Sequence, residues 1–429
     1  MTDPDGQRSA LFAASAAAVA ATLLVLVQHP RGIALTADGW AFWQGAVSLA
    51  EGHGLVYFTG RPIFAWPPLY PALLALVQQL AGSTGSALLA TTTLLAAVQA
   101  GAATWAVLHI WAGAAGRAPL AGIAAVAACE ALLAGGAEHP VLADGLKAAL
   151  LPLFALALWR SRERPDDLAR AAATATSAAL LLLAAHSSLA YLAAGATLIA
   201  PRLLAAGLRL RRATIAVGTF GLPVLLWWAV RRRLEPDGGH LVAWGEGRER
   251  PTGYLRQLAV EIPQLLTPGP FVAGLLALGA LALLYATLRR RGPTNDSLRF
   301  LERFCVVSTL VLFGMFNLTW IHDRLGGRFL VALPMFLGPA LLLAAATRRR
   351  LLVALALPLL LAAPLARTVE RTHAQWTKSD AELGFPHSFV TLDSRIESGY
   401  VDGPPRREEN GWLLAPLPWE VPRRRPPGE

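Results

Sequence analysis

Residues 9–27, SALFAASAAAVAATLLVLV, decide the fold class of this chain, because they form an apolar run without a charged side chain. The hydrocarbon core of a bilayer is about 30 Å thick and requires roughly 20 apolar residues in helical form. Only helices and closed barrels satisfy their backbone hydrogen bonds there, and this run lacks the alternation of a barrel strand. It is longer than the apolar part of a typical signal peptide, and no small-x-small cleavage signature precedes His29 and Pro30. We therefore predict a helical membrane anchor.

Further apolar runs of the same kind follow along the chain. Hydrophobic residues make up 55% of the 429 positions, charged residues only 15%, and the mean hydropathy is +0.46. Such a chain cannot cover itself with polar side chains, which excludes an ordinary soluble globule, a disordered chain and a disulfide scaffold. We predict an all-α polytopic membrane protein with about 11 transmembrane helices, within a range of 9 to 13. The predicted spans are 9–27, 86–111, 118–135, 144–159, 171–185, 187–204, 213–230, 271–288, 303–320, 328–347 and 351–366.

The net charge of +10 reflects the topology of the chain and does not point to nucleic acid. Basic residues gather in short gaps between the apolar runs, and such gaps face the cytoplasm under the positive-inside rule. These gaps are 160–170, 202–212, 289–303 and 348–350. A cytoplasmic N-terminus then places 28–68, 135–143, 231–270 and 367–429 on the external side. The basic residues 231–233 disagree with this scheme, because they fall on the external side.

Residues 1–366 are expected to form one transmembrane domain, and residues 367–429 a short external segment. Within that segment we expect a small lid over 376–414 and disorder at the Pro-rich end. Cys129 and Cys305 lie inside apolar runs and carry no information about the redox compartment. The sequence contains no CxxC, HExxH, Walker or GxGxxG motif, which removes the common zinc, ATP and dinucleotide signals.

The first external segment, 28–68, carries the most distinctive polar and aromatic residues of the chain. Helical spacing over 39–51 predicts a short amphipathic helix in the membrane interface, ended by Gly52. Its apolar positions are Trp40, Trp43, Val47 and Ala50, and its polar positions are Gln44, Ser48 and Glu51. Asp38 at its start has two interpretations, an N-cap or a functional carboxylate. The second requires a rigid loop, which the turn at Trp66-Pro67-Pro68 supplies.

These residues resemble the first external loop of the GT-C superfamily of membrane glycosyltransferases. The similarity lies in the acidic residue that opens the loop, the aromatic helix, Gly52-His53-Gly54 and Pro67-Pro68-Leu69-Tyr70. It is strongest to bacterial relatives of the aminoarabinose transferase and to protein O-mannosyltransferases. Gly39 stands where that group often carries a second acid, which leaves Asp38 alone in its motif.

Two later segments add to the resemblance, which covers roughly residues 9–347 in order. Residues 141–144 before an apolar helix resemble the second acidic motif of the group. Residues 323–334 resemble its Arg-Tyr-Leu motif before a Leu-rich helix, with Phe329 where Tyr is usual. The tail is short for this group.

The resemblance implies an inverting glycosyltransferase that moves a sugar from a polyprenyl-phosphate donor to a lipid, glycan or protein acceptor. The reaction would occur on the non-cytoplasmic face of the bacterial inner membrane, with Asp38 as the general base that accepts the hydroxyl proton. Cationic side chains would stabilise the leaving phosphate, whose negative charge grows as the bond breaks. The candidates for phosphate binding are Arg324, Arg328, His322, His186 and Lys147. The candidates for binding the acceptor or a divalent cation, the one cofactor that the resemblance leaves open, are Asp144, Glu138 and His139.

Several of these side chains also have simpler interpretations. Asp144 and Lys147 stand one helical turn apart, so they can neutralise each other where an unpaired charge costs about 2.5–3.5 kcal/mol. Arg324 and Arg328 also fit an interfacial pair at helix ends. His186 also fits a hydrogen-bonded residue at a break in the apolar stretch 171–204.

The alternative function from another class is a transporter or flippase of lipid-linked solutes. Such a protein is expected to carry broken or charged helices in matched halves of the chain. This chain instead concentrates its distinctive residues in the first external loop, which favours the enzyme.

Overall fold

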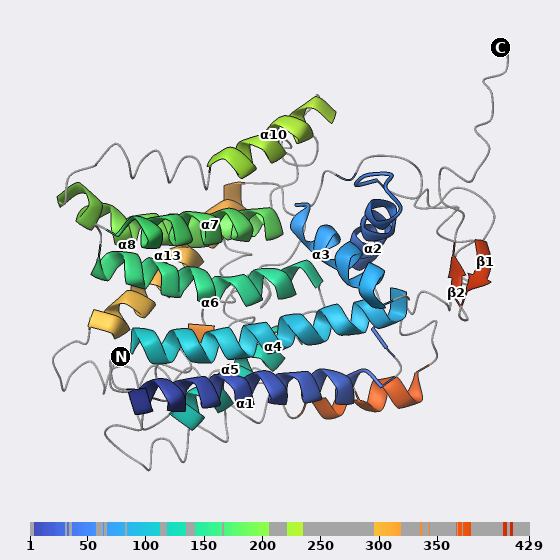
Figure 1. Cartoon of the computed structure of the whole chain (residues 1–429), viewed down its shortest axis with the longest axis horizontal. Helices are drawn as coiled ribbons and strands as arrows, with labels where there is room; N and C mark the ends of the chain where they lie inside the picture. Colours follow the sequence, from blue (N-terminus) through green and yellow to red (C-terminus); the bar gives the residue numbers. More distant parts are fainter. Residues whose placement is uncertain are drawn as a thin grey trace.

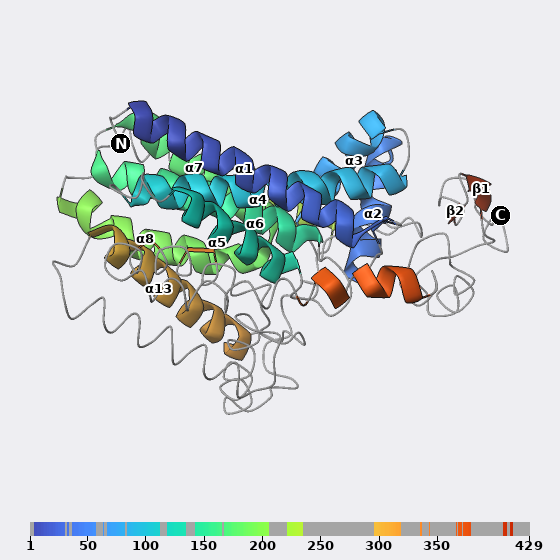
Figure 2. The same cartoon turned by 90° about the horizontal axis from the view of Figure 1, so that it is seen from below.

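The computed structural model is a bundle of helices that run side by side, with two shorter helices at one end (Figures 1 and 2). It describes residues 4–30, 32–33, 37–56, 63, 67–81, 84–111, 118–133, 142–164, 167–205, 221–234, 296–318, 335–336, 343, 366, 368–370, 372–378, 406–409 and 412–414. The strands β1 (Arg406–Glu409) and β2 (Trp412–Leu414) form a short antiparallel hairpin in the tail. All elements described between residues 4 and 318 are helices, which confirms the predicted fold class.

The longer helices match predicted apolar runs. They are α1 (Pro4–Gln28), α4 (Thr84–Ile110), α5 (Ala118–Leu133), α6 (Leu142–Glu163), α7 (Leu168–Ala184), α8 (Leu189–Ala205) and α13 (Asp296–Leu318). Among the described residues, Pro4–Gln28 and Ser86–Ile110 are long and apolar enough to cross a membrane by length and composition. Shorter apolar helices are Leu69–Ala81, Ala118–Cys129 and Leu168–Ala184.

Two helices depart from the predicted spans. α3 (Leu69–Ala81) coincides with no predicted span, because its 13 residues are too few to cross a bilayer. α10 (Leu222–Leu234) continues through residues 231–233, which the sequence placed in an external loop, and residues 213–220 of the predicted span lie outside the described residues. The predicted span 271–288 and most of 328–347 and 351–366 lie outside the described residues.

Small side chains allow α1 to pack closely against α4 and α5. The buried face of α1 is a stripe of alanines, namely Ala10, Ala13, Ala14, Ala17 and Ala21. A Cβ atom placed on Gly101 of α4 would lie 3.3 Å from the carbonyl oxygen of Ala14. A Cβ atom placed on Gly122 of α5 would likewise lie 3.3 Å from the carbonyl oxygen of Ala13. Small residues at helix interfaces are typical of membrane proteins, where close van der Waals packing drives helix association.

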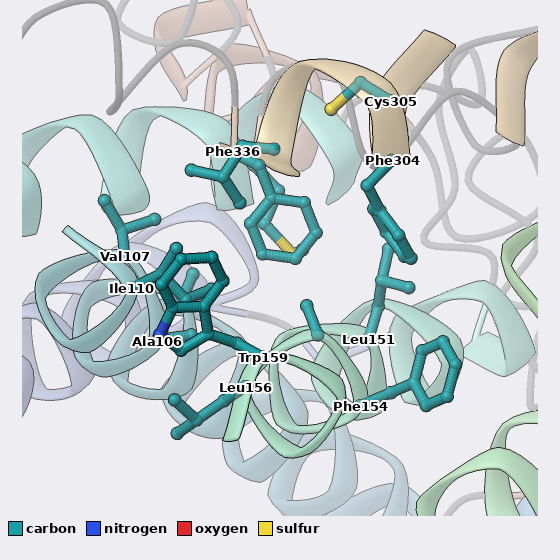
Figure 3. Packing of buried hydrophobic residues seen from close by; sticks show 14 of the residues in the cluster. Ala106, Val107, Ile110, Leu151, Phe154, Leu156, Trp159, Phe304, Cys305 and Phe336 are labelled. Atoms are coloured by element: carbon teal, nitrogen blue, oxygen red, sulfur yellow. The ribbon is translucent and has the colours of Figure 1, made fainter. Parts of the chain in front are cut away.

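A second core of aromatic side chains joins α6, α8 and α13 (Figure 3). The ring centroids of Trp159 and Phe300 lie 5.1 Å apart, and those of Phe154 and Phe304 lie 6.2 Å apart. Phe304 also meets Phe336 edge-on at 5.8 Å. Aromatic pairs of this kind add about 0.5–1.5 kcal/mol beyond the area that they bury. They fix α13 against α6, although the two helices are far apart in the sequence.

Two of the basic gaps meet at one end of the bundle. Arg162, at the end of α6, donates two hydrogen bonds of 2.9 Å to the carboxylate of Asp296 at the start of α13. Its guanidinium carbon lies 5.2 Å from the ring centroid of Trp159. A bidentate ion pair over an aromatic ring combines charge-assisted hydrogen bonds with a cation–π contact. The gaps at 160–170 and 289–303 therefore share one end, as the charge pattern requires of loops on one side.

Replacing Gly101 with leucine is expected to lower the free energy of unfolding by about 1–3 kcal/mol, because the Ala14 carbonyl belongs to the backbone and cannot move aside. Thermal unfolding of the purified protein in detergent measures this loss. Ala90→Leu, at an exposed position of the same helix, is the control and should leave the unfolding temperature nearly unchanged. Equal unfolding temperatures for the two variants would contradict the close approach of α1 and α4.

Candidate functional site

The end of the bundle opposite the Arg162–Asp296 pair carries α2 (Ala37–Ala50) and α3 (Figure 1). One buried cluster joins these two helices to α4, to the beginning of α6 and to the end of α7. It includes Trp43, Val47, Tyr70, Leu74, Leu88, Leu146 and Ala184. α2 and α3 are therefore packed against the bundle, next to the beginning of α6, which carries Asp144 and Lys147, and the end of α7, which precedes His186.

α2 confirms the predicted short helix and shows where Asp38 stands in it. The helix begins at Ala37, so Asp38 lies in its first turn. An acidic residue in a first turn is favoured by the positive end of the helix dipole. The backbone of Asp38 is described, whereas its side chain is not among the described ones.

α2 is more fully buried than its sequence pattern predicts. Gln44 and Ser48, assigned to the polar face, are only 2% and 0% exposed. Phe42 is equally buried and meets Tyr70 of α3 edge-on, with 5.2 Å between the ring centroids. The polar positions Gln44 and Ser48 of this amphipathic helix are therefore enclosed, because α3 and the bundle pack around α2.

A tight turn ends α2 and fixes the loop that follows. Gly52 and Gly54 have φ angles of +83° and +86°, a region that residues with a side chain enter only at about 1–2 kcal/mol. The Ser48 hydroxyl donates to the carbonyl oxygen of Gly54 at 2.7 Å, and the backbone N–H of His53 donates to the carbonyl oxygen of Ser48 at 2.9 Å. The Gly52-His53-Gly54 motif thus forms the turn and gives the buried Ser48 hydroxyl its partner.

Asp144 and Lys147 form the predicted ion pair at the beginning of α6. Lys147 Nζ lies 2.5 Å from Asp144 Oδ1 and donates a second hydrogen bond to Ser187 Oγ at 3.2 Å. The Lys147 side chain is 0% exposed, whereas the Asp144 side chain retains 16% exposure. Ser187 belongs to the short 3-10 helix η2 (His186–Ser188) between α7 and α8. Sequence reasoning missed Ser187, and its only signal was the polar His-Ser-Ser break in an apolar stretch.

The break predicted within 171–204 is confirmed at His186. α7 ends at Ala184, and Ala185 adopts an extended conformation with φ −157° and ψ 134°. The backbone N–H of Ser188 donates to the Ala185 carbonyl at 3.0 Å before α8 begins. His186 therefore stands directly beside Ser187, the hydrogen-bond partner of Lys147.

Three of the predicted site residues, Asp144, Lys147 and His186, thus lie at the end of the bundle that carries the helix of Asp38. The other predicted site residues fall outside the described residues, namely Glu138, His139, His322, Arg324 and Arg328. Within the described part of the chain, no group of three or more His, Cys, Asp or Glu side chains could hold a metal ion.

The start of the tail lies at this end as well. Gln28 Nε2, in the last turn of α1, donates to Thr368 Oγ1 at 3.0 Å. The described residues 368–370 and 372–377 are helical and lie beside the end of α1 (Figure 2). The first loop and the tail therefore leave the bundle at the same end.

No protein-family model matches the sequence, and no curated protein sequence matches it. Solved structures do match. ArnT from Cupriavidus metallidurans in the apo state aligns with a TM-score of 0.57 and 14% identity, over 89% of this chain and 79% of ArnT. The same protein bound to undecaprenyl phosphate aligns with a TM-score of 0.55 and 13% identity, over 91% and 80% of the two chains. An oligosaccharyltransferase from Archaeoglobus fulgidus, in complex with Zn and sulfate, aligns at 0.47 and 12%, over 93% and 58%.

The chain therefore shares the fold of ArnT. This likeness extends over most of the chain, and it confirms the fold that the sequence resemblance led us to expect. At this level of identity the likeness concerns the fold.

Replacing Gly54 with valine is expected to destabilise the loop after α2 by about 1–2 kcal/mol, because valine is strained at a φ of +86°. Limited proteolysis of the purified protein, followed by mass spectrometry of the cleavage sites, measures the opening of residues 37–56. His53→Val, at the exposed neighbouring position, is the matched control. If both variants are cleaved at the wild-type rate, the left-handed turn does not hold the loop.

Proposed function

We propose that this chain is an inverting membrane glycosyltransferase that moves a sugar from a polyprenyl-phosphate donor to an acceptor hydroxyl. The observation that carries the proposal is the likeness in fold, over 91% of this chain, to an ArnT structure bound to undecaprenyl phosphate. The arrangement of the bundle end supports it, because the helix that contains Asp38 is seated near the Asp144–Lys147 pair. We place the reaction at the external face of the bacterial inner membrane, and the acceptor is a lipid, a glycan or a protein.

The proposed reaction combines one proton transfer with one exchange of bonds. The acceptor oxygen forms a bond to the anomeric carbon on the face opposite the leaving group. The bond from that carbon to the phosphate oxygen breaks, and its electron pair remains on the polyprenyl phosphate. The acceptor proton passes to the carboxylate of Asp38, which we assign as the general base. The same negative charge stabilises the oxocarbenium-like transition state.

We assign the leaving phosphate to Arg324 and Arg328, with His322 beside them in the sequence. Guanidinium groups bind phosphate through two parallel hydrogen bonds and stabilise the charge that develops on it. We assign acceptor binding to Asp144, together with Glu138 and His139 from the preceding segment. Asp144 fits this assignment because its side chain remains partly exposed at the bundle end.

Asp38→Asn is expected to lower the transfer rate by about 100-fold or more, because an amide cannot accept the proton of the acceptor hydroxyl. Membranes that contain the variant are assayed for sugar transfer or release from a panel of polyprenyl-phosphate sugars. Glu51→Gln is the matched control, since it removes an exposed carboxylate at the other end of α2 and should leave the rate unchanged. A wild-type rate in Asp38→Asn would remove the assigned base, whereas movement of an intact lipid-linked solute without transfer would favour the transporter.

Arg324→Gln and Arg328→Gln are each expected to lower kcat/KM for the donor by about 100- to 1000-fold, because each removes a cation from the leaving phosphate. Arg303→Gln, at an exposed position of α13, is the control and should leave kcat/KM near the wild-type value. Initial rates over a range of donor concentrations provide this comparison. Wild-type values for both variants would place the phosphate elsewhere.

A further inference from the structure

Lys147 is the most enclosed charged side chain in the part of the chain that the structure describes. Every other Lys, Arg, Asp or Glu whose side chain is described there keeps partial or full exposure. An isolated ammonium group in such surroundings is strongly unfavourable, so its charge has to be compensated by a close partner. Asp144 supplies the opposite charge at 2.5 Å, and the Ser187 hydroxyl accepts a second hydrogen bond at 3.2 Å.

The side chains of Asp144 and Lys147 differ in their exposure. Asp144 keeps 16% of its side chain exposed, whereas Lys147 keeps none. A donor phosphate would therefore have to displace the existing partners of Lys147 to reach Nζ. The side chain of Asp144, by contrast, keeps part of its surface exposed while its Oδ1 accepts a hydrogen bond from the ammonium group.

Lys147 also connects two segments that are distant in the sequence. Its own helix carries Asp144 one turn earlier, and its second partner, Ser187, belongs to η2 between α7 and α8. The ammonium group thus fixes the first turn of α6 against the break that follows α7.

We propose that Lys147 is a positioning residue that holds the carboxylate of Asp144 in a fixed orientation at the bundle end, and that it does not itself bind the donor phosphate. The proposal deepens the function proposed above and rests on it, because Asp144 is assigned there to the acceptor. It replaces the sequence-based assignment of Lys147 to the phosphate.

The test compares Lys147→Met, Asp144→Asn and the double variant in the full-length protein, reconstituted in lipid and supplied with an active polyprenyl-phosphate sugar. Lys147→Met is expected to lower kcat by about 10- to 100-fold, the size of effect that a misplaced group produces, while the donor KM stays within about twofold. Asp144→Asn should give a similar loss. The double variant should be no slower than Asp144→Asn alone, because Lys147 acts only through Asp144.

Three kinetic results would overturn the proposal. A donor KM raised about tenfold at unchanged kcat in Lys147→Met would show that the ammonium group contacts the phosphate. A double variant whose loss equals the product of the two single losses would show independent roles. Full activity of Asp144→Asn would leave Lys147 with nothing functional to position.

Conservative variants and thermal unfolding separate positioning from a general loss of folding. Lys147→Arg keeps the charge and should recover part of the kcat that Lys147→Met loses. The double variant should unfold at a higher temperature than Lys147→Met, because it no longer leaves a carboxylate without its counter-charge. Arg8→Met is the matched control, since Asp5 and Arg8 have the same spacing but are 87% and 84% exposed, and it should change neither rate nor unfolding temperature.

The role of Ser187, whose hydroxyl is the second partner of Lys147, is tested by one variant and one control. Ser187→Ala removes the second acceptor of Lys147 and should lower kcat by a few fold, in the same direction as Lys147→Met. Ser177→Ala, whose hydroxyl bonds only within α7 to the Thr174 carbonyl, should have no effect. A wild-type kcat in Ser187→Ala would restrict the positioning role to the pair with Asp144.

Failure of the proposed function is distinguishable from failure of this inference. Absence of transfer from every donor in the wild-type protein overturns the proposed glycosyltransferase. The unfolding temperatures of Lys147→Met and the double variant then test whether Asp144 depends on Lys147. Recovery of stability in the double variant supports the dependence of Asp144 on Lys147, and absence of recovery overturns it.

Discussion

Each polar group inside an apolar bundle has to find its partner among neighbouring residues, because hydrocarbon offers none. Some hydroxyl groups find a partner within their own helix, as the Thr104 hydroxyl does by donating to the Ala100 carbonyl at 2.8 Å. The Ser48 hydroxyl instead depends on a glycine turn after its helix. The ammonium group of Lys147 takes its hydrogen-bond partners from two elements, Asp144 in α6 and Ser187 in η2. The architecture at the candidate site follows from these requirements, since each satisfied group ties one segment to the next.

Close packing and polar pairing act at different places in this fold. The alanine face of α1 brings α4 and α5 together along their length and contributes no chemistry of its own. At the end of the bundle, α2 and α3 add buried aromatic rings and place the helix of Asp38 against α4, α6 and α7. The likeness in fold at 13–14% identity concerns this scaffold and does not by itself carry over the side chains at its end.

Local properties of the sequence were sufficient to predict the long helices and the Asp144–Lys147 pair. An apolar run such as α1 can be recognised without its neighbours, and a pair one helical turn apart needs only the helix that carries it. The burial of Gln44 could not be predicted, because it depends on what covers α2. Ser187 was missed for the same reason, since it stands 40 residues from the lysine that it meets.

α6 is tied to a different neighbour near each of its ends. Lys147 joins it to the turn after α7, and Arg162, 15 residues later and about 22 Å along the axis, joins it to the start of α13. Sliding α6 by one helical turn, about 5.4 Å, would separate both sets of partners together. The two sets of contacts therefore fix the position of α6 along its own axis relative to η2 and α13.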